Sequence, residues 1–201
     1  MHSIENQLFH RIKNRGFGSC FTARELLSIG SREAVWQGLS RLEAQGKIRR
    51  LAQGLYEYPK RHAEIGILSP DPEQIAQAIA KRDGARIQIS GALAAHQLGL
   101  TDQVPARAEF LTSGPNRKLQ IGSREIVLKR TTLRNMSIAG RISGTVVQAL
   151  RHIGEDNVRL EQIDELAARL ATEQKAQIWA DRNAAPGWML PILKRISGAS
   201  E

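Results

Sequence analysis

The chain of 201 residues contains a single cysteine, Cys20. One cysteine cannot form an intrachain disulfide, and it excludes metal sites built from several thiolates. Aromatic residues make up only 4% of the sequence, and no apolar run approaches the roughly 20 residues that a membrane-spanning helix needs. The first residues also lack the apolar segment of a secretory signal peptide. These absences predict a soluble, cytoplasmic protein that does not associate with membranes.

Positive charge is what the sequence has in excess. Lys and Arg number 29 against 20 Asp and Glu, which gives a net charge of +9. The excess is uneven, because residues 1–61 carry 11 basic and 5 acidic residues whereas residues 151–201 carry 7 and 8. A basic chain with its charge concentrated in one segment predicts a polyanionic partner that binds there.

The first 61 residues carry the pattern of a winged helix-turn-helix. After a first amphipathic helix, Thr22 and Glu25 have the spacing of a capping box, which predicts a short second helix. Ser31 then caps a longer helix that Gly46 ends. Two helices joined by about three residues with a glycine are typical of a helix-turn-helix, whose second member, the recognition helix, enters the major groove of DNA.

The recognition helix divides into an apolar and a polar face. Val35, Leu39 and Leu42 follow the spacing of a buried stripe. The residues predicted to meet DNA on the opposite face are Ser31, Arg32, Trp36, Gln37, Ser40 and Arg41. Arg32 and Gln37 are the candidate base readers, because Arg pairs with guanine and Gln with adenine through two hydrogen bonds. Trp36 suits this face and the core equally well.

A β-hairpin with Gly54 in its turn is predicted after the recognition helix, where helical spacing gives way to alternation. A basic hairpin at this place is typical of a wing, which contacts the phosphate backbone or the minor groove. The cations predicted to do so are Lys47, Arg49, Arg50, Lys60 and Arg61. The alternative is that the whole segment is a packing module that binds protein.

Residues 62–142 are predicted to form a small α+β unit, with a helix after Pro70-Asp71-Pro72 and a hairpin around Gly122-Ser123. Its basic residues are Arg117, Lys118, Arg124, Lys129 and Arg130. Two interpretations stay open. These residues form a second nucleic-acid surface, for instance for RNA, or they are solvated side chains that protect strand edges from pairing with other chains.

Residues 143–201 are predicted to form a helical bundle, because their apolar residues recur at helical spacing. The fold class is therefore α+β, with a winged helix-turn-helix followed by a small α/β unit and a C-terminal helical bundle. The predicted domains are residues 1–61, 62–142 and 143–201.

No catalytic constellation emerges from the sequence. The five histidines are scattered without the spacing of metal ligands. The strongest enzyme hypothesis is a metal-dependent nuclease built on Glu109, Glu125 and Lys129. Residues four apart on one strand, such as Glu125 and Lys129, lie about 13 Å from each other, which is too far to serve one metal ion. The sequence thus predicts a non-enzymatic protein with no cofactor and no metal.

The order of several motifs resembles the AbiEi-type antitoxins, in particular an uncharacterised subgroup of that family. The motifs in the N-terminal segment are Phe21-Thr22-Ala23-Arg24-Glu25-Leu26-Leu27, Gly30-Ser31-Arg32-Glu33-Ala34-Val35, Leu39-Ser40-Arg41-Leu42, Gly46-Lys47-Ile48-Arg49-Arg50-Leu51 and Gly54-Leu55-Tyr56. Those further along are Leu68-Ser69-Pro70-Asp71-Pro72, Ser90-Gly91-Ala92, Leu98-Gly99-Leu100, Gln103-Val104-Pro105-Ala106, Leu111-Thr112-Ser113-Gly114-Pro115 and Gln148-Ala149-Leu150-Arg151. The resemblance covers nearly the whole chain.

The resemblance implies the antitoxin of a type IV toxin–antitoxin operon, of the abortive-infection type. Such an antitoxin represses its own operon by binding double-stranded operator DNA, and a homodimer would suit a palindromic operator. It also counteracts a nucleotidyltransferase-like toxin, without a stable complex and through its C-terminal domain. Gln53 stands where many relatives have an Arg, which removes one phosphate contact. The alternative function is a protein-interaction module that binds a toxin or another chain directly.

Overall fold

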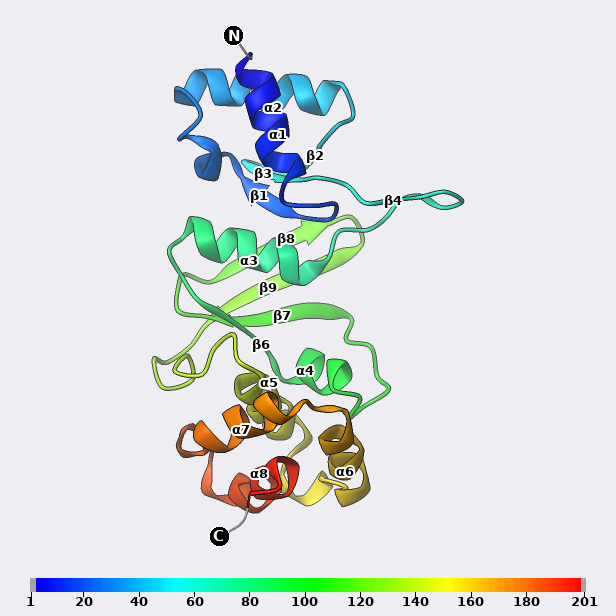
Figure 1. Ribbon diagram of the computed structural model, residues 1–201, viewed down its shortest axis with the longest axis vertical. Helices are drawn as coiled ribbons and strands as arrows, with labels where there is room; N and C mark the ends of the chain where they lie inside the picture. Colours follow the sequence, from blue (N-terminus) through cyan, green and yellow to red (C-terminus); the bar gives the residue numbers. More distant parts are fainter. Residues whose placement is uncertain (1–2, 200–201) are drawn as a thin grey trace. The chain divides into compact units, whose positions relative to one another are not determined.

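The computed structural model describes residues 3–199 and has the mixed α+β architecture that the sequence predicts. The chain divides into two compact units, residues 1–85 and residues 86–201, which Figure 1 colours from blue to green and from green to red. The finer division at residues 61 and 142 stays a prediction. In the part of the chain that the structure describes, no helix is long and apolar enough to span a membrane.

The N-terminal unit combines helices, a three-stranded sheet and a separate hairpin. Its elements are α1 (Ile4–Lys13), β1 (Cys20–Thr22), the 3-10 helix η1 (Ala23–Leu26), α2 (Arg32–Ala44), β2 (Arg49–Ala52), β3 (Leu55–Glu57), β4 (Arg61–His62), β5 (Gly66–Ile67) and α3 (Pro72–Arg82). The sheet has the strand order β1-β3-β2 and is antiparallel throughout. This order of elements is the one expected for a winged helix, because α2 occupies the place of the predicted recognition helix and β2–β3 that of the predicted wing.

The recognition helix packs through the stripe that its sequence predicts. Val35, Leu39 and Leu42 are fully buried, together with Leu8 of α1 and Phe21 of β1. Each such side chain contributes about 1.5–3 kcal/mol when it leaves water. The apolar side of α2 is therefore fixed against α1 and the sheet, and its opposite side is turned outward.

Local signals explain where α2 begins and ends. The Ser31 hydroxyl accepts a hydrogen bond from the amide of Ala34 at 3.3 Å, as an N-cap does. Gly46 follows the helix with a φ of +66°, a left-handed conformation that glycine adopts without strain. The predicted short helix before it is a 3-10 helix of four residues.

The C-terminal unit combines a four-stranded sheet with helices. Its elements are β6 (Ile87–Ile89), α4 (Gly91–Gln97), β7 (Arg107–Thr112), β8 (Arg117–Ile121), β9 (Arg124–Arg130), α5 (Ile142–Ile153), η2 (Glu155–Asn157), α6 (Leu160–Arg169), α7 (Thr172–Ala180), η3 (Arg182–Ala184), η4 (Gly187–Met189) and α8 (Leu190–Ser197). The sheet order is β6-β7-β9-β8. Strands β7 and β9 pair in parallel, whereas β6–β7 and β8–β9 are antiparallel pairs.

Alternation along β7 and β9 separates an apolar from a polar face of this sheet. Phe110, Ile126 and Leu128 are buried on one face. The neighbouring positions Glu109 and Lys129 point to the other face and belong to its charged surface. Both of these side chains on the polar face line a cleft of the C-terminal unit.

Candidate nucleic-acid interface

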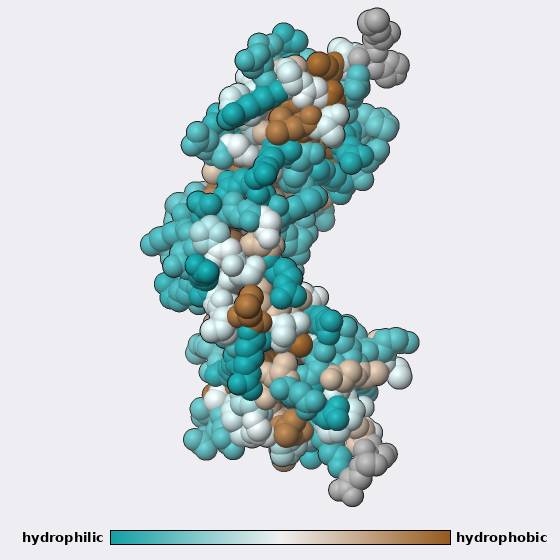
Figure 2. Space-filling view, turned by 90° about the vertical axis from the view of Figure 1, so that its left-hand side faces the viewer, coloured by the Kyte–Doolittle hydropathy of each residue, from teal (hydrophilic) through white to brown (hydrophobic). Residues whose placement is uncertain are grey.

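All six residues predicted to meet DNA on the recognition helix are exposed in the structure. They are Ser31, Arg32, Trp36, Gln37, Ser40 and Arg41. Trp36, which the sequence fits to either side of the helix, is 47% exposed and so lies on the outward face. On the side of the molecule drawn in Figure 2, hydrophilic side chains predominate and hydrophobic ones form small separate groups.

Arg32 and Trp36 form a pair on this face. The guanidinium carbon of Arg32 lies 4.3 Å from the centre of the Trp36 ring, one helical turn away. A cation–π contact at an exposed site contributes about 0.5–1 kcal/mol. The contact holds the five donors of the Arg32 guanidinium in a restricted position at the start of α2, where base edges are reached in helix-turn-helix proteins.

The wing cations have two different environments. Arg50 is exposed. Arg49 donates to the Glu57 carboxylate, with a distance of 2.9 Å from Nε to Oε2, and to the Leu68 carbonyl at 2.9 Å. Glu57 is only 1% exposed, and burial raises its pKa although the hydrogen bond from Arg49 opposes that rise. Arg49 therefore neutralises an interior carboxylate, and Arg50 is the wing arginine that is open to a ligand.

Two further predicted cations meet the end of the recognition helix. The Arg61 guanidinium donates to the Gly46 carbonyl at 3.1 Å, and Lys47 Nζ lies 4.9 Å from the centre of the Phe9 ring. Both side chains and that of Lys60 are exposed. The structure thus places Lys47 and Arg61 together beside the last residues of α2.

Lys60 and Arg61 lead into a second hairpin that the sequence does not predict. Strands β4 and β5 pair Arg61 with Ile67 and His62 with Gly66, and Figure 1 shows this hairpin extending away from the three-stranded sheet. Gly66 opens β5 directly after the turn and adopts a φ of +74°, so its glycine is a turn signal in the sequence. Two-residue strands are too short to show alternation, so sequence patterns miss them.

The basic residues of the C-terminal sheet do not share one face. The pairing register puts Lys118 and Lys129 on the polar face, whereas Arg117, Arg124 and Arg130 lie on the opposite face. Lys118 contacts Glu125 at 2.6 Å and Lys129 contacts Glu109 at 2.7 Å. A hollow of about 570 Å³ between β8 and β9 is lined by four of the five, which are Arg117, Lys118, Lys129 and Arg130. Arg117 and Lys118 lie on the edge strand β8 and fit the protection of a strand edge, whereas Arg124 and Arg130 belong to the inner strand β9.

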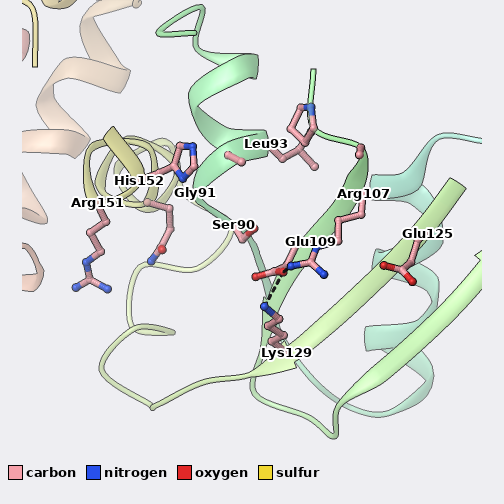
Figure 3. A pocket seen from close by; sticks show the side chains of 13 residues that line it. Ser90, Gly91, Leu93, Arg107, Glu109, Glu125, Lys129, Arg151 and His152 are labelled. Atoms are coloured by element: carbon pink, nitrogen blue, oxygen red, sulfur yellow. Dashed lines mark ion pairs between the residues drawn. The ribbon is translucent and has the colours of Figure 1, made fainter. Parts of the chain in front are cut away.

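The three residues of the nuclease hypothesis, Glu109, Glu125 and Lys129, all line a cleft of about 720 Å³ on the polar face (Figure 3). Glu109 and Lys129 meet because β7 and β9 are neighbours, a pairing that distances along a single strand do not reveal, whereas Glu125 pairs with Lys118. Lys129 and Arg107 both contact the Glu109 carboxylate, at 2.7 and 3.5 Å. Among residues 3–199, no three His, Cys, Asp or Glu side chains lie close enough together to hold a metal ion.

Cys20 has the environment of an unreactive thiol. It is buried in β1, and burial raises its pKa to about 12, with the nearby Glu57 and Asp71 carboxylates adding to the rise. A thiol with this pKa stays protonated at neutral pH and is a poor nucleophile.

A model of a protein family described as a family of unknown function, DUF6088, matches residues 7–178. Among solved structures, the chain is similar to the RV2827C protein from Mycobacterium tuberculosis, with a TM-score of 0.48 and 15% sequence identity over 100% of this chain and 78% of that one. No curated protein matches the sequence significantly.

Proposed function

The chain belongs to the DUF6088 family, whose function is unknown, and we propose that it is a DNA-binding transcriptional repressor whose recognition helix α2 enters the major groove. The observation that carries the proposal is the outward face of α2. Two arginines, a glutamine and a tryptophan are exposed there, while the opposite side of the helix is fully buried. A helix held by its apolar side with such a face outward has the chemistry that base edges and phosphates require.

Each side chain has a distinct role in this proposal. Arg32, held by Trp36, donates two hydrogen bonds to a guanine, and Gln37 pairs with an adenine. Arg41, Lys47, Arg50, Lys60 and Arg61 are the exposed cations that neutralise phosphates. Arg49 stays with Glu57 and supports the wing from inside.

Single substitutions separate base contacts from phosphate contacts. We expect Arg32→Ala to cost about 1–3 kcal/mol at one base pair, so that the preference for that base pair relaxes. Arg50→Ala should weaken binding to all sequences alike. The measurement is fluorescence anisotropy with a duplex from the region upstream of the gene and a scrambled duplex of equal length.

An exposed arginine of the other unit provides the matched control. Arg159 lies just before α6, and Arg159→Ala removes the same charge from a different element. This variant should bind both duplexes as the unaltered protein does. If Arg32→Ala weakens the two duplexes equally, or if Arg159→Ala weakens binding as much as Arg50→Ala, the assignment of α2 and the wing to DNA is wrong.

We further propose that the repressor is the antitoxin of a toxin–antitoxin operon. This part of the proposal is supported by the resemblance of its motifs to AbiEi-type antitoxins, which pair with nucleotidyltransferase-like toxins. Co-expression with a neighbouring gene that encodes such a protein should relieve growth arrest. Growth arrest that persists at equal expression of both proteins would contradict the antitoxin role while leaving DNA binding in place.

A further inference from the structure

The cleft on the polar face of the C-terminal sheet has the composition of a ligand site. Figure 3 shows Lys129 reaching from β9 toward Glu109 with Arg107 beside it, while His152 and Arg151 line the cleft from α5 and stand apart from that group. All of its lining residues belong to the C-terminal unit. Its volume of about 720 Å³ falls within the range of roughly 300–1,000 Å³ that small-molecule sites occupy.

Ser90 supplies a buried polar group at this cleft. It is only 8% exposed, and its backbone is fixed by hydrogen bonds from its amide to the Glu109 carbonyl at 3.1 Å and from the Ala94 amide to its own carbonyl at 2.9 Å. Although Ser90 precedes α4, its hydroxyl does not cap that helix. Ser90 lines the cleft, where its hydroxyl can bond to a bound molecule.

The wall of the cleft retains positive charge after its ion pairs are counted. Arg107 and Lys129 share the single carboxylate of Glu109, which leaves one positive charge in excess. Glu125 is neutralised by Lys118, which lies outside the lining. Arg151 donates at 2.8 Å to the side-chain carbonyl of Asn135, a neutral partner, and so keeps its full charge.

The remaining wall is small and apolar. Ala92, Leu93, Pro105 and Ala106 line it. Gly91 allows α4 to start directly against α5, since a Cβ there would lie 2.6 Å from the Cβ of His152. The cleft thus offers cations and a hydroxyl for an anionic group and an apolar wall for the rest of a ligand.

From these groups we infer that the cleft binds a small phosphorylated molecule of mononucleotide size. A phosphate monoester carries a charge of about −1.5 to −2 and accepts several hydrogen bonds, which suits the excess of positive charge along the wall of the cleft. The cleft volume of about 720 Å³ favours a molecule of this size over a nucleic-acid strand. The site is separate from the DNA surface proposed for α2 and does not depend on it.

Isothermal titration of the full chain tests this inference, with adenosine, guanosine, cytidine and uridine 5′-monophosphates and with inorganic phosphate as probes. We expect at least one nucleotide to bind. Lys129→Gln and Arg151→Gln should each raise its dissociation constant about tenfold or more, and Ser90→Ala should raise it by a smaller factor. Circular dichroism and the melting temperature establish that each variant is folded.

Arg124→Gln is the matched control, because Arg124 lies on the opposite face of β9 from Lys129. It should bind the nucleotide with an unchanged dissociation constant. No binding of any probe at millimolar concentration, or equal binding by all folded variants, would overturn the inference. Tighter binding of a single-stranded oligonucleotide than of the mononucleotide through the same residues would also overturn it, in favour of a nucleic-acid site.

Discussion

Glu25 does more than close a capping box with Thr22, because its carboxylate also binds residues of two other parts of the N-terminal unit. Its carboxylate accepts from the Thr22 amide at 2.9 Å, from Arg15 after α1 at 3.0 Å and from Lys81 of α3 at 2.8 Å. Its side chain is 9% exposed. Burial raises the pKa of Glu25, but the bonds from Lys81, the Thr22 amide and Arg15 together outweigh burial and leave the pKa below its ordinary value of 4.5.

This shift gives Glu25 a defined effect on acid stability. An acid whose pKa is lower in the folded state stabilises the fold above its ordinary pKa, and that contribution is lost as the pH falls through the folded-state value. The free energy of unfolding should therefore fall on acidification below pH 4.5, and it should fall less steeply in Glu25→Gln. Urea unfolding at a series of pH values measures both slopes.

The same substitution at the exposed Glu64 serves as the control. Glu64→Gln should retain the steep acid dependence of the unaltered protein. Equal slopes in Glu25→Gln and the unaltered protein would show that Glu25 does not carry this part of the stability.

At the scale of elements, the contact between α4 and α5 depends on a missing side chain. A Cβ at Gly91 would meet the His152 Cβ at 2.6 Å and the Gln148 carbonyl oxygen at 3.2 Å, and neither atom is the flexible end of a side chain. Gly91→Ala should therefore destabilise the C-terminal unit by about 1–3 kcal/mol, as overpacking does. Chemical unfolding followed by tryptophan fluorescence measures the loss.

Gly187 is the suitable control for this substitution. It also stands at the start of a short helix, but a Cβ there would meet no atom within 4 Å. Gly187→Ala should leave stability unchanged or raise it by about 0.4–1 kcal/mol. A Gly91→Ala variant as stable as Gly187→Ala would contradict the close approach of the two helices.

The sequence predicts elements that are set by local chemistry and misses those set by pairing at a distance. Ser31, the buried stripe from Val35 to Leu42 and Gly46 are enough to define α2. The hairpin β8–β9 is likewise predicted from Gly122. The parallel pairing of β7 with β9 has no local signal, so the meeting of Glu109 with Lys129 emerges only in the structure.

The same distinction holds within the proposed DNA surface. Exposure of Arg32, Trp36 and Arg41 follows from helical spacing, because residues opposite a buried stripe must face outward. The commitment of Arg49 to Glu57 does not follow from spacing alone. To predict this ion pair, one must know that Arg49 of β2 and Glu57 of β3 are partners in the strand register and that Glu57 is buried.

For the whole molecule, the central claim is that the charge excess of the N-terminal segment serves to bind DNA. The five exposed cations Arg41, Lys47, Arg50, Lys60 and Arg61 would displace counterions from phosphates. Charge that merely keeps the protein soluble would leave binding absent or indifferent to salt. The two cases differ in the salt dependence of DNA binding, which can be measured without knowing the operator sequence.

A titration of a fluorescent duplex with the full chain over a range of salt concentrations is the most direct measurement. If the five cations each neutralise a phosphate, the logarithm of the association constant should fall with the logarithm of salt concentration at a slope of about −4 to −5. Arg50→Ala should make this slope shallower by about one. A slope near zero, or one that Arg50→Ala leaves unchanged, would contradict the assignment of this surface to DNA.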